Sequence, residues 1–464
     1  TDAKVGEIAI TSIVPNPEKR YNDPALKMGL HMAMVPNGIL IGTLAEDVKS
    51  IVTNMTSKTP ALSTAPGYVA ATKSIATAGS EMQMYMAPDA IVDFGMSVMK
   101  MAAAEEPDLA MIDMEGISRA IAAMGMDDLG TLAMASNYSD GKCTTISSHA
   151  HKSGGTAATK HVDMSFLKWV PKDAVSLSSG SMNATSLYDT LVKGLQAYDA
   201  NVAEMMLGQL SEMETQLGFT IRNDLFGSLG DHYISWSMPM GTISSAPEVA
   251  TLLKINNQEK LVGALKNMAA LTGGLIEIEE GTKRGVKSYQ MLVNMDDGGD
   301  MGMGINPFEM IQPTFAFKDG YMVIGFSASD VKRVFKRMDR EDNPKGDIRG
   351  NKEFMAVADT IPEGVTSISF TDWKANFEST YQLLTGVLAF VPMPEDVPID
   401  MSLLPDSETL TDHLFATVSY TKSDGDGSTA VNVSPFGPEL VMAAFAIGVA
   451  GGVVGVAMSP SDFR

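Results

Sequence analysis

Three segments of this chain share one order: an apolar strand-like run, a polar break and a short amphipathic helix. Residues 39–55 read ILIGTLAEDVKSIVTNM, residues 252–268 read LLKINNQEKLVGALKNM, and residues 322–338 read MVIGFSASDVKRVFKRM. The first and third copies also share a glycine, Gly42 or Gly325, and a downstream Asp-Val-Lys tripeptide. Repetition of this kind indicates how a protein is built and says little about its chemistry.

The elements that follow the first and third copies also occur in the same order. Each copy is followed by a glycine-containing turn, an alternating strand, a helix and a further strand before a Ser-Asp-Gly turn. The matching parts are Gly79 and Gly364, strands 82–86 and 365–370, and strands 132–138 and 413–420. Residues 1–163 and 287–437 are therefore predicted to be copies of one module, with a related but different segment, 164–286, between them.

We expect an α+β fold in which the modules form antiparallel, twisted sheets with short helices packed on one face. Residues 164–437 make one complete unit, and residues 1–163 match only its C-terminal half. Because residue 1 is Thr and not Met, we expect that it follows a processing site. The expected partners are further copies of the chain, other protein subunits, or a cleaved N-terminal fragment of the same precursor.

The C-terminal segment, 438–464, has a different character. Leu440–Ser459 carries no charged residue, and a helix of that length would cross a hydrocarbon layer of roughly 30 Å. Two overlapping glycine pairs, Gly448 with Gly452 and Gly451 with Gly455, would allow close approach between helices. The segment is interpreted as an apolar helix that lies in a membrane, in a protein assembly, or in the core.

Composition and charge exclude one class of partner. The formal net charge is −22 and the isoelectric point is about 4.6, whereas a nucleic-acid-binding surface needs clustered Lys and Arg. We therefore expect no nucleic acid partner. The acidity favours solubility and suits a salty extracellular environment. The single cysteine, Cys143, excludes an intrachain disulfide.

The best candidate for a metal site is the pair His149 and His151. Positions i and i+2 of a strand point to one face, so two imidazoles could share one ion. Cys143 and His161 flank the pair, and a closed zinc site needs four ligands. The alternative is that these are solvent-exposed histidines in a Ser-rich loop. No cofactor is predicted.

Other candidate chemistry is weaker. The acidic runs 296–300 and 424–427 could hold calcium, but neither fits the twelve-residue calcium loop, and hairpin turns explain them better. Ser228, Asp231 and His232 could form a nucleophilic triad only if the tertiary structure brings them together. The common nucleophile and phosphate-loop motifs are absent from the sequence, so we expect a protein that is not an enzyme.

Three stretches of sequence carry a resemblance to a known group of proteins. They are VPKDAV at 170–175, the LGF and NDLFGSLGD elements within 217–231, and FKDGYMVIGFS at 317–327. The chain resembles an uncharacterised domain family of large exported bacterial proteins, well represented in planctomycete-like bacteria. The resemblance covers 164–437 directly and 1–163 through the internal repeat. It implies export and an envelope or extracellular location, and it implies no catalytic residues.

The sequence as a whole favours an exported, non-enzymatic structural or assembly protein, associated with a surface, a membrane or a large oligomer. The alternative is a periplasmic or surface module that binds a ligand between its sheet and helices. A hydrolase or metal enzyme is the third hypothesis, and only the histidine pair supports it.

Overall fold

The fold is described by a computed structural model. The structure describes residues 3–13, 30–36, 38–42, 44–57, 64, 66–73, 75, 80–87, 92–93, 95–97, 99–100, 113–125, 129–151, 160–240, 248–283, 286–294, 312–388, 405–423 and 427–438. The predicted apolar helix Leu440–Ser459 lies outside the described residues, and so do its glycines Gly448, Gly451, Gly452 and Gly455.

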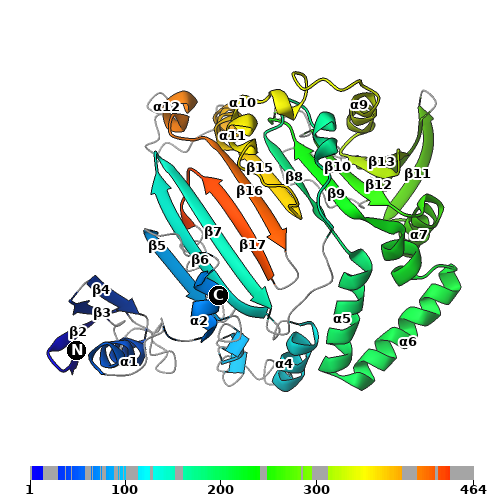
Figure 1. Ribbon diagram of the computed structural model, residues 1–464. Helices are drawn as coiled ribbons and strands as arrows, with labels where there is room; N and C mark the ends of the chain where they lie inside the picture. The colour runs from blue at the N-terminus through cyan, green and yellow to red at the C-terminus, as the bar shows by residue number, and fades with distance from the viewer. Residues whose placement is uncertain are drawn as a thin grey trace, which may run out of the picture.

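Most strands belong to one sheet of 13 strands (Figure 1). Its strand order is β11-β12-β13-β14-β10-β9-β8-β15-β16-β17-β7-β6-β5, and all neighbours are antiparallel. Its strands are β5 (Met82–Met86), β6 (Leu129–Ser139), β7 (Lys142–His151), β8 (Ser176–Ser181), β9 (Leu229–Ser237), β10 (Val249–Ile255), β11 (Ile276–Lys283), β12 (Val286–Val293), β13 (Thr314–Lys318), β14 (Tyr321–Gly325), β15 (Ser367–Asp372), β16 (Ala416–Ser423) and β17 (Gly427–Ser434).

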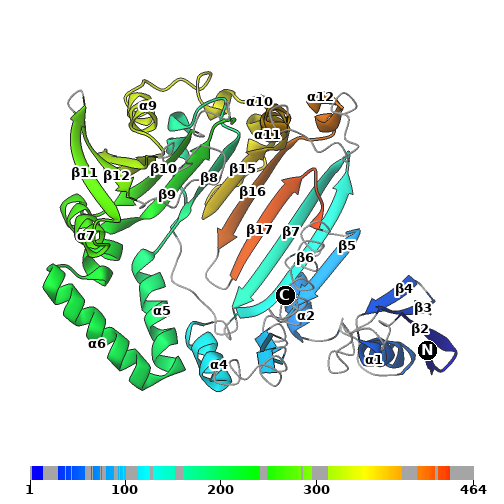
Figure 2. The ribbon, with the colours of Figure 1, turned by 180° about the vertical axis from the view of Figure 1, so that it is seen from behind.

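A second, smaller sheet lies beyond β5, at the end of the molecule away from β11 (Figures 1 and 2). Its strands follow one another in chain order as β1 (Ala3–Val5), β2 (Ile8–Ile13), β3 (Leu30–Val35) and β4 (Gly38–Gly42). Helix α1 (Ala45–Thr56) packs on one face of this sheet. There Ile10, Ala33, Val48 and Val52 form a buried cluster, which gives the small sheet a core of its own.

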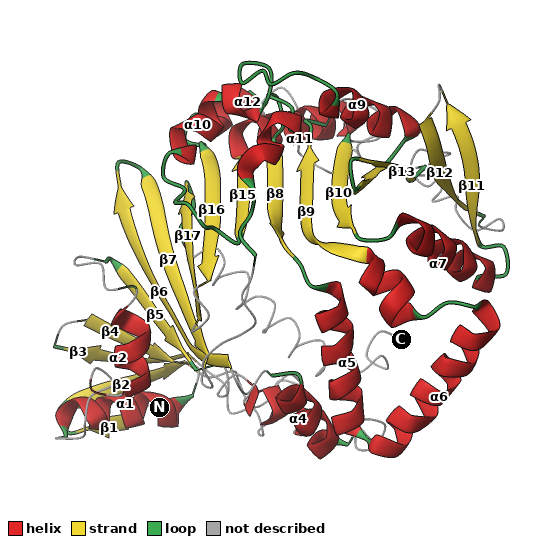
Figure 3. Cartoon of the chain, turned by 45° about the vertical axis from the view of Figure 1, so that its right-hand side comes forward, coloured by secondary structure: helices red, strands yellow, loops and turns green. Residues whose placement is uncertain are grey.

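Helices gather at both ends of the large sheet's strands: α9 to α12 lie at one end, and α4 to α6 lie at the other (Figure 3). The remaining longer helices are α2 (Pro66–Lys73), α4 (Met114–Ala123), α5 (Ala184–Tyr198), α6 (Ala200–Leu217), α7 (Gln258–Leu271), α9 (Ala328–Met338), α10 (Lys352–Ala358), α11 (Trp373–Leu388) and α12 (Ser407–Thr411). Shorter turns are η3 (Met164–Trp169), η4 (Ile221–Leu225), η5 (Phe226–Ser228) and η6 (Ile348–Gly350). Helices and antiparallel sheets together confirm the predicted α+β class.

None of the helices in the described ranges is both long and apolar enough to span a lipid bilayer.

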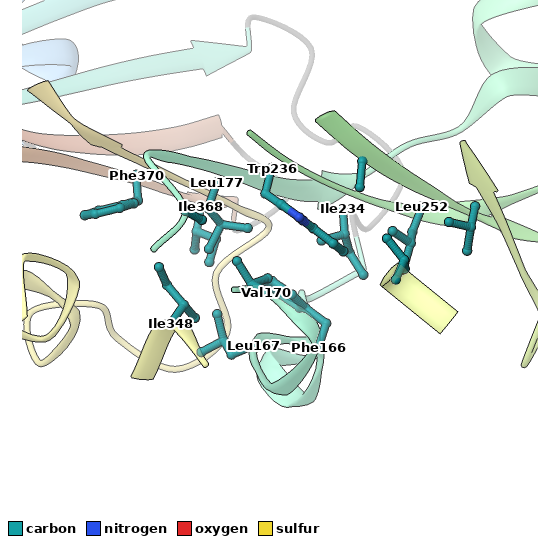
Figure 4. Close-up of a cluster of buried hydrophobic side chains, with 14 of the residues drawn as sticks. Phe166, Leu167, Val170, Leu177, Ile234, Trp236, Leu252, Ile348, Ile368 and Phe370 are labelled. Carbon is teal, nitrogen blue, oxygen red and sulfur yellow. The ribbon is translucent and has the colours of Figure 1, made fainter. Parts of the chain in front are cut away.

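The largest buried cluster joins the middle of the large sheet to η3, α9, η6 and α10 (Figure 4). Trp236 on β9 is 1% exposed and lies in this cluster with Leu177 of β8 and Phe370 of β15. Phe370 packs edge-on against Phe354 of α10, with ring centroids 5.3 Å apart. This core holds segment 164–286 and segment 287–437 together, because both contribute strands and helices to it.

A second cluster lies on the opposite face of β14. Val323 belongs to the first cluster, whereas its neighbours Met322 and Ile324 pack with Leu261 of α7 and Phe315 of β13. Helices therefore cover both faces in this part of the sheet, and the prediction of helices on one face only is wrong there. The reason is that β14 reads YMVIG, with apolar side chains at successive positions, and such a strand needs cover on both sides.

The third strand–helix motif shows why its helix forms where it does. Ser327 caps the N-terminus of α9, since its hydroxyl accepts a hydrogen bond from the Asp330 amide at 3.3 Å. Val331, Val334 and Phe335 then bury one face at helical spacing. The helices predicted in all three copies are confirmed as α1, α7 and α9.

The predicted hairpin turn at residues 139–141 is also confirmed. Asp140 and Gly141 have φ angles of 51° and 74°, which suit a tight two-residue turn, and Ser139 pairs with Lys142 across it. The predicted strand 82–86 coincides with β5.

Strands of the three predicted segments lie in one continuous sheet. Phe370 of β15 pairs with Leu177 of β8, which joins 287–437 to 164–286. Val431 of β17 pairs with Ile146 of β7, which joins 287–437 to 1–163.

The turn η4 is held in place by the carboxylate of Asp224. This carboxylate accepts hydrogen bonds from Lys260 Nζ at 2.7 Å, from the Thr220 amide at 2.7 Å and from the Thr220 hydroxyl at 2.9 Å. These bonds, with that from Lys260 as the largest cause, lower the pKa of Asp224 to about 2. The ionised carboxylate therefore ties η4 to helix α7.

Replacing Asp224 by Asn is expected to lower the free energy of unfolding at pH 7 by about 1 kcal/mol. The pKa of Asp224 is lower in the folded than in the unfolded chain. The stabilisation is therefore fully present above about pH 4 and is lost as the pH falls toward 2. Urea unfolding of both proteins between pH 7 and pH 2 measures this. A difference that stays constant across that range would contradict the assignment, and Glu259→Gln on α7 is the control with no expected effect.

Candidate functional site

The two histidines predicted as metal ligands lie at alternate positions of β7. His149 is opposite Leu132 and His151 is opposite Leu129 on β6. Cys143 is buried on the same strand, and its distance from His149 is about 20 Å at ~3.4 Å per residue, so it cannot join them at one ion. Within the described ranges, no three or more His, Cys, Asp or Glu side chains form a group that could hold a metal. The histidine pair stays a prediction.

The remaining candidate ligands are His161 and the two acidic runs. His161 is exposed beside Gly364, with Cε1 3.5 Å from where a β-carbon on that glycine would lie. The acidic run 296–300 lies outside the described residues, and so do residues 424–426 of the second run.

The proposed triad residues Ser228, Asp231 and His232 each lie in a different environment. Ser228 is buried at the end of η5, and its hydroxyl has no hydrogen-bond partner among the described residues. Asp231 forms an ion pair with Lys160. The Nε2 atom of His232 lies 2.8 Å from Ser179 Oγ, on β8, and so the three residues do not form a triad.

The pair of Ser179 and His232 belongs to the packing of the sheet. Ser179 is fully buried and donates its hydroxyl proton to the Tyr233 carbonyl at 3.0 Å, so it accepts from His232 Nε2. The other ring nitrogen of His232 lies 3.4 Å from the Tyr321 hydroxyl. Burial lowers the pKa of His232, although the charges of Asp231 and Asp163 oppose that effect. A neutral imidazole that donates to Ser179 cannot act as a base toward it.

An open polar pocket of about 720 Å³ lies where β8 and β9 meet the start of α5. Its polar lining includes Lys160, Asn183, Asp231 and Asn256. The Asn183 side chain also caps α5 by accepting from the Ser186 amide at 3.0 Å. With the hydroxyl residues Ser181, Thr185 and Ser186, these groups could hold a small polar molecule.

The small sheet carries an exposed apolar face opposite α1. Cross-strand pairing places Met34 beside Ile39 and Leu30 beside Ile13 on this face, which Ile41 extends. The exposed fractions are 69% for Met34, 60% for Ile39, 59% for Ile41, 58% for Ile13 and 42% for Leu30. Contiguous exposed apolar surface with several large side chains is typical of an interaction site. We call these five residues the open face.

Two sheet edges, one in each sheet, are unprotected. β4 ends the small sheet and β5 ends the large one, and no described strand pairs with their outer sides. Their sequences, GILIG and MQMYM, contain no charge and no proline. The opposite edges differ: β11 reads IEIEEGTK and β1 contains Lys4, and charges of this kind block edge-to-edge pairing.

Comparison of the chain with protein-family models, with curated proteins and with solved structures finds no match in any of the three. The function is therefore inferred from the surfaces of the molecule itself.

The sequence alone predicted neither the contacts of His232 with Ser179 and Tyr321 nor the open face. Ser179 and Tyr321 are 53 and 89 residues from His232 in the chain, so no local motif joins them. The apolar run at 39–42 could be read directly, but it has the same form whether a face is buried or exposed.

Proposed function

We propose that this protein is a non-enzymatic structural component of an assembly of protein subunits. The observation that carries the proposal is the open face, together with the unprotected edges of β4 and β5. Burial of one large aliphatic side chain stabilises by about 1.5–3 kcal/mol, so five such side chains in water leave a large driving force unused. An interaction with another polypeptide would bury the face and pair the edges.

The predicted repeat supports an architecture that is built by addition of modules. Under this proposal β1–β4 with α1 and β11–β14 with α9 are copies of one substructure. Their hairpins share one register: His31 pairs with Gly42, and Thr314 pairs with Gly325. Gly42 and Gly325 both lie where a strand approaches the following helix so closely that a β-carbon would be 2.7 Å from a helix side chain.

The proposed location is the cell envelope or the extracellular space. The net charge of −22 and the resemblance to exported bacterial proteins support export. We further propose that Leu440–Ser459 contacts a membrane or an apolar surface of the assembly. Protease treatment of intact cells tests the location, since an exported chain is degraded and a cytoplasmic one survives.

The geometry around His232 supports a role without catalysis. Among the described residues, the serine within hydrogen-bond distance of this imidazole is Ser179, which is fully buried and directs its proton to a backbone carbonyl. The isolated protein is expected to show no activity toward ester, peptide or phosphate substrates, and turnover that is lost in the His232→Gln variant would contradict this.

A ligand-binding module is the second candidate, and the polar pocket beside α5 favours it. This alternative predicts that protein purified from its natural source carries a small molecule that is released on denaturation. Mass spectrometry of the released fraction shows whether such a molecule is bound, and its absence would count against a ligand-binding module.

The role of the open face in association can be tested by placing charged side chains on it. Without its partner, the purified chain is expected to self-associate as its concentration rises, because the face and the edges remain available. The double variant Ile39→Lys and Ile41→Lys is expected to stay at the mass of one chain, 49.4 kDa, in analytical ultracentrifugation.

The matched control places two lysines on another exposed apolar pair. Leu187 and Leu191 of α5 are 58% and 55% exposed, and their replacement by Lys is expected to leave self-association unchanged. A wild-type chain that remains a monomer at every concentration would contradict the proposed function.

A further inference from the structure

We infer that β4, β5 and the open face together receive one partner segment that folds as residues 176–271 do: a strand, a helical crossing, two strands and a helix. The inference rests on the proposed function and names the kind of partner. The complete unit formed by 164–437 provides the template. The edge of β4, the edge of β5 and the open face each have a counterpart there that is covered by another element.

The small sheet matches β11–β14 residue by residue. Met32 pairs with Ile41 as Phe315 pairs with Ile324, and Ala33 pairs with Leu40 as Ala316 pairs with Val323. The neighbouring strands keep the same correspondence. Ala33 also pairs with Ile10, and Ala316 pairs with Ser288. Positions 31–42 therefore correspond to positions 314–325, and β4 corresponds to β14.

The free edge of β4 corresponds to an edge that β10 occupies. On the outer side of β14, Val323 pairs with Leu252 and Met322 pairs with Leu253. The corresponding positions on β4 are Leu40 and Ile39. A strand equivalent to β10 would therefore pair antiparallel with β4 and complete its backbone hydrogen bonds.

The open face corresponds to a face that helix α7 covers. Met322 is only 7% exposed, because it packs in the cluster that contains Leu261 of α7. Its counterpart Ile39 is 60% exposed. α7 follows β10 directly in the chain, so the segment that pairs with β4 would also bring the helix that covers Ile39, Ile41 and Met34.

The free edge of β5 corresponds to an edge that β8 occupies. Met82 of β5 pairs with Ser136 of β6, at the same sequence separation as Ser367 of β15 and Thr421 of β16. On its other side β15 pairs with β8, with Ile368 opposite Ser179. A strand equivalent to β8 would therefore pair with β5.

One segment can fill all three places. In the large sheet β14 is followed by β10, β9 and β8, and then by β15. The same order between β4 and β5 needs three consecutive strands, and in the complete unit a single stretch of chain supplies them together with α7. The partner is thus a polypeptide segment with the strand and helix order and the apolar pattern of 176–271, and it would join the small sheet to the large one.

The test uses the full chain with a second copy of its own segment. Residues 164–280 are duplicated and joined ahead of Ala3. Val5 pairs with Ile8 across the hairpin of β1 and β2, and Lys283 pairs with Val286 across the hairpin of β11 and β12, so Val5 corresponds to Lys283. Joining residue 280 of the duplicate to Ala3 therefore reproduces the connection between α7 and β11 in the complete unit. Hydrogen exchange measured by mass spectrometry is expected to slow by at least about tenfold at 39–42 and 82–86, relative to the chain without the duplication.

The control is the same duplicated chain with Ile39→Lys and Ile41→Lys, which prevents an α7-like helix from packing on the open face. It is expected to lose the slowing at 39–42. Unchanged exchange at both strands in the duplicated chain overturns the inference. Self-association of the unmodified chain is measured separately. If the unmodified chain self-associates but the duplication slows exchange in neither strand, the role in an assembly is supported and a partner segment of this kind is ruled out.

Discussion

Replacing Trp236 by Ala is expected to lower the free energy of unfolding by about 3–5 kcal/mol, the range for removing a large aromatic side chain from a core. Trp236 is 1% exposed and lies at the centre of the cluster that joins the sheet to η3 and α9. It pairs with Leu177 on β8 and with Ala250 on β10, so strands on both sides hold the surrounding backbone in place. The site cannot collapse to fill the cavity, which places the expected loss in the upper part of the range.

The matched control is Trp373→Ala. Trp373 is 37% exposed and donates its indole N–H to the Thr417 hydroxyl at 2.7 Å. Its removal is expected to lower the free energy of unfolding by only about 1–2 kcal/mol, since one hydrogen bond and partial burial are lost. Denaturant unfolding followed by circular dichroism measures both variants. Equal losses in the two would show that the cluster around Trp236 does not hold the fold together.

Gly325→Val is expected to have the second largest effect, a loss of about 2–3 kcal/mol. A β-carbon at this position would lie 2.7 Å from the β-carbon of Asp330 and 3.3 Å from the Val331 amide nitrogen. Both atoms belong to α9 close to its start, so the helix itself would have to move away from β14. That displacement would open the cluster in which Val331 and Val334 are buried.

Gly281→Val on β11 is the matched control, because a β-carbon there would meet nothing within 4 Å. This variant is expected to be neutral or slightly stabilising, since a β-branched residue suits a strand. Thermal unfolding distinguishes the two variants. A Gly325→Val protein as stable as the Gly281→Val protein would mean that α9 does not depend on close contact with β14.

The strand–helix joints of this fold could be predicted from the sequence, and the order of strands in the sheet could not. The joints depend on neighbours in the chain: an apolar run, a cap such as Ser327 and apolar residues at helical spacing. The pairings of β15 with β8 and of β17 with β7 join strands that are far apart in the chain, and no local pattern specifies them. The prediction of one-sided helices failed at β14 because α7 covers the face opposite to α9.

The candidate functional surfaces show the same difference between what local sequence predicts and what depends on tertiary structure. The apolar run Ile39, Leu40, Ile41 indicates a strand, but only the tertiary structure shows that Leu40 faces α1 while the two isoleucines face water. The contacts of His232 with Ser179 and Tyr321 join three strands, so the local motif around Ser228 pointed to a site that does not form.

A role within a protein assembly can be tested by native mass spectrometry of the protein isolated from its natural source. We expect a complex in which this chain is bound either to further copies of itself or to a second polypeptide. A species that contains a single polypeptide chain and nothing bound to it would contradict a role in an assembly.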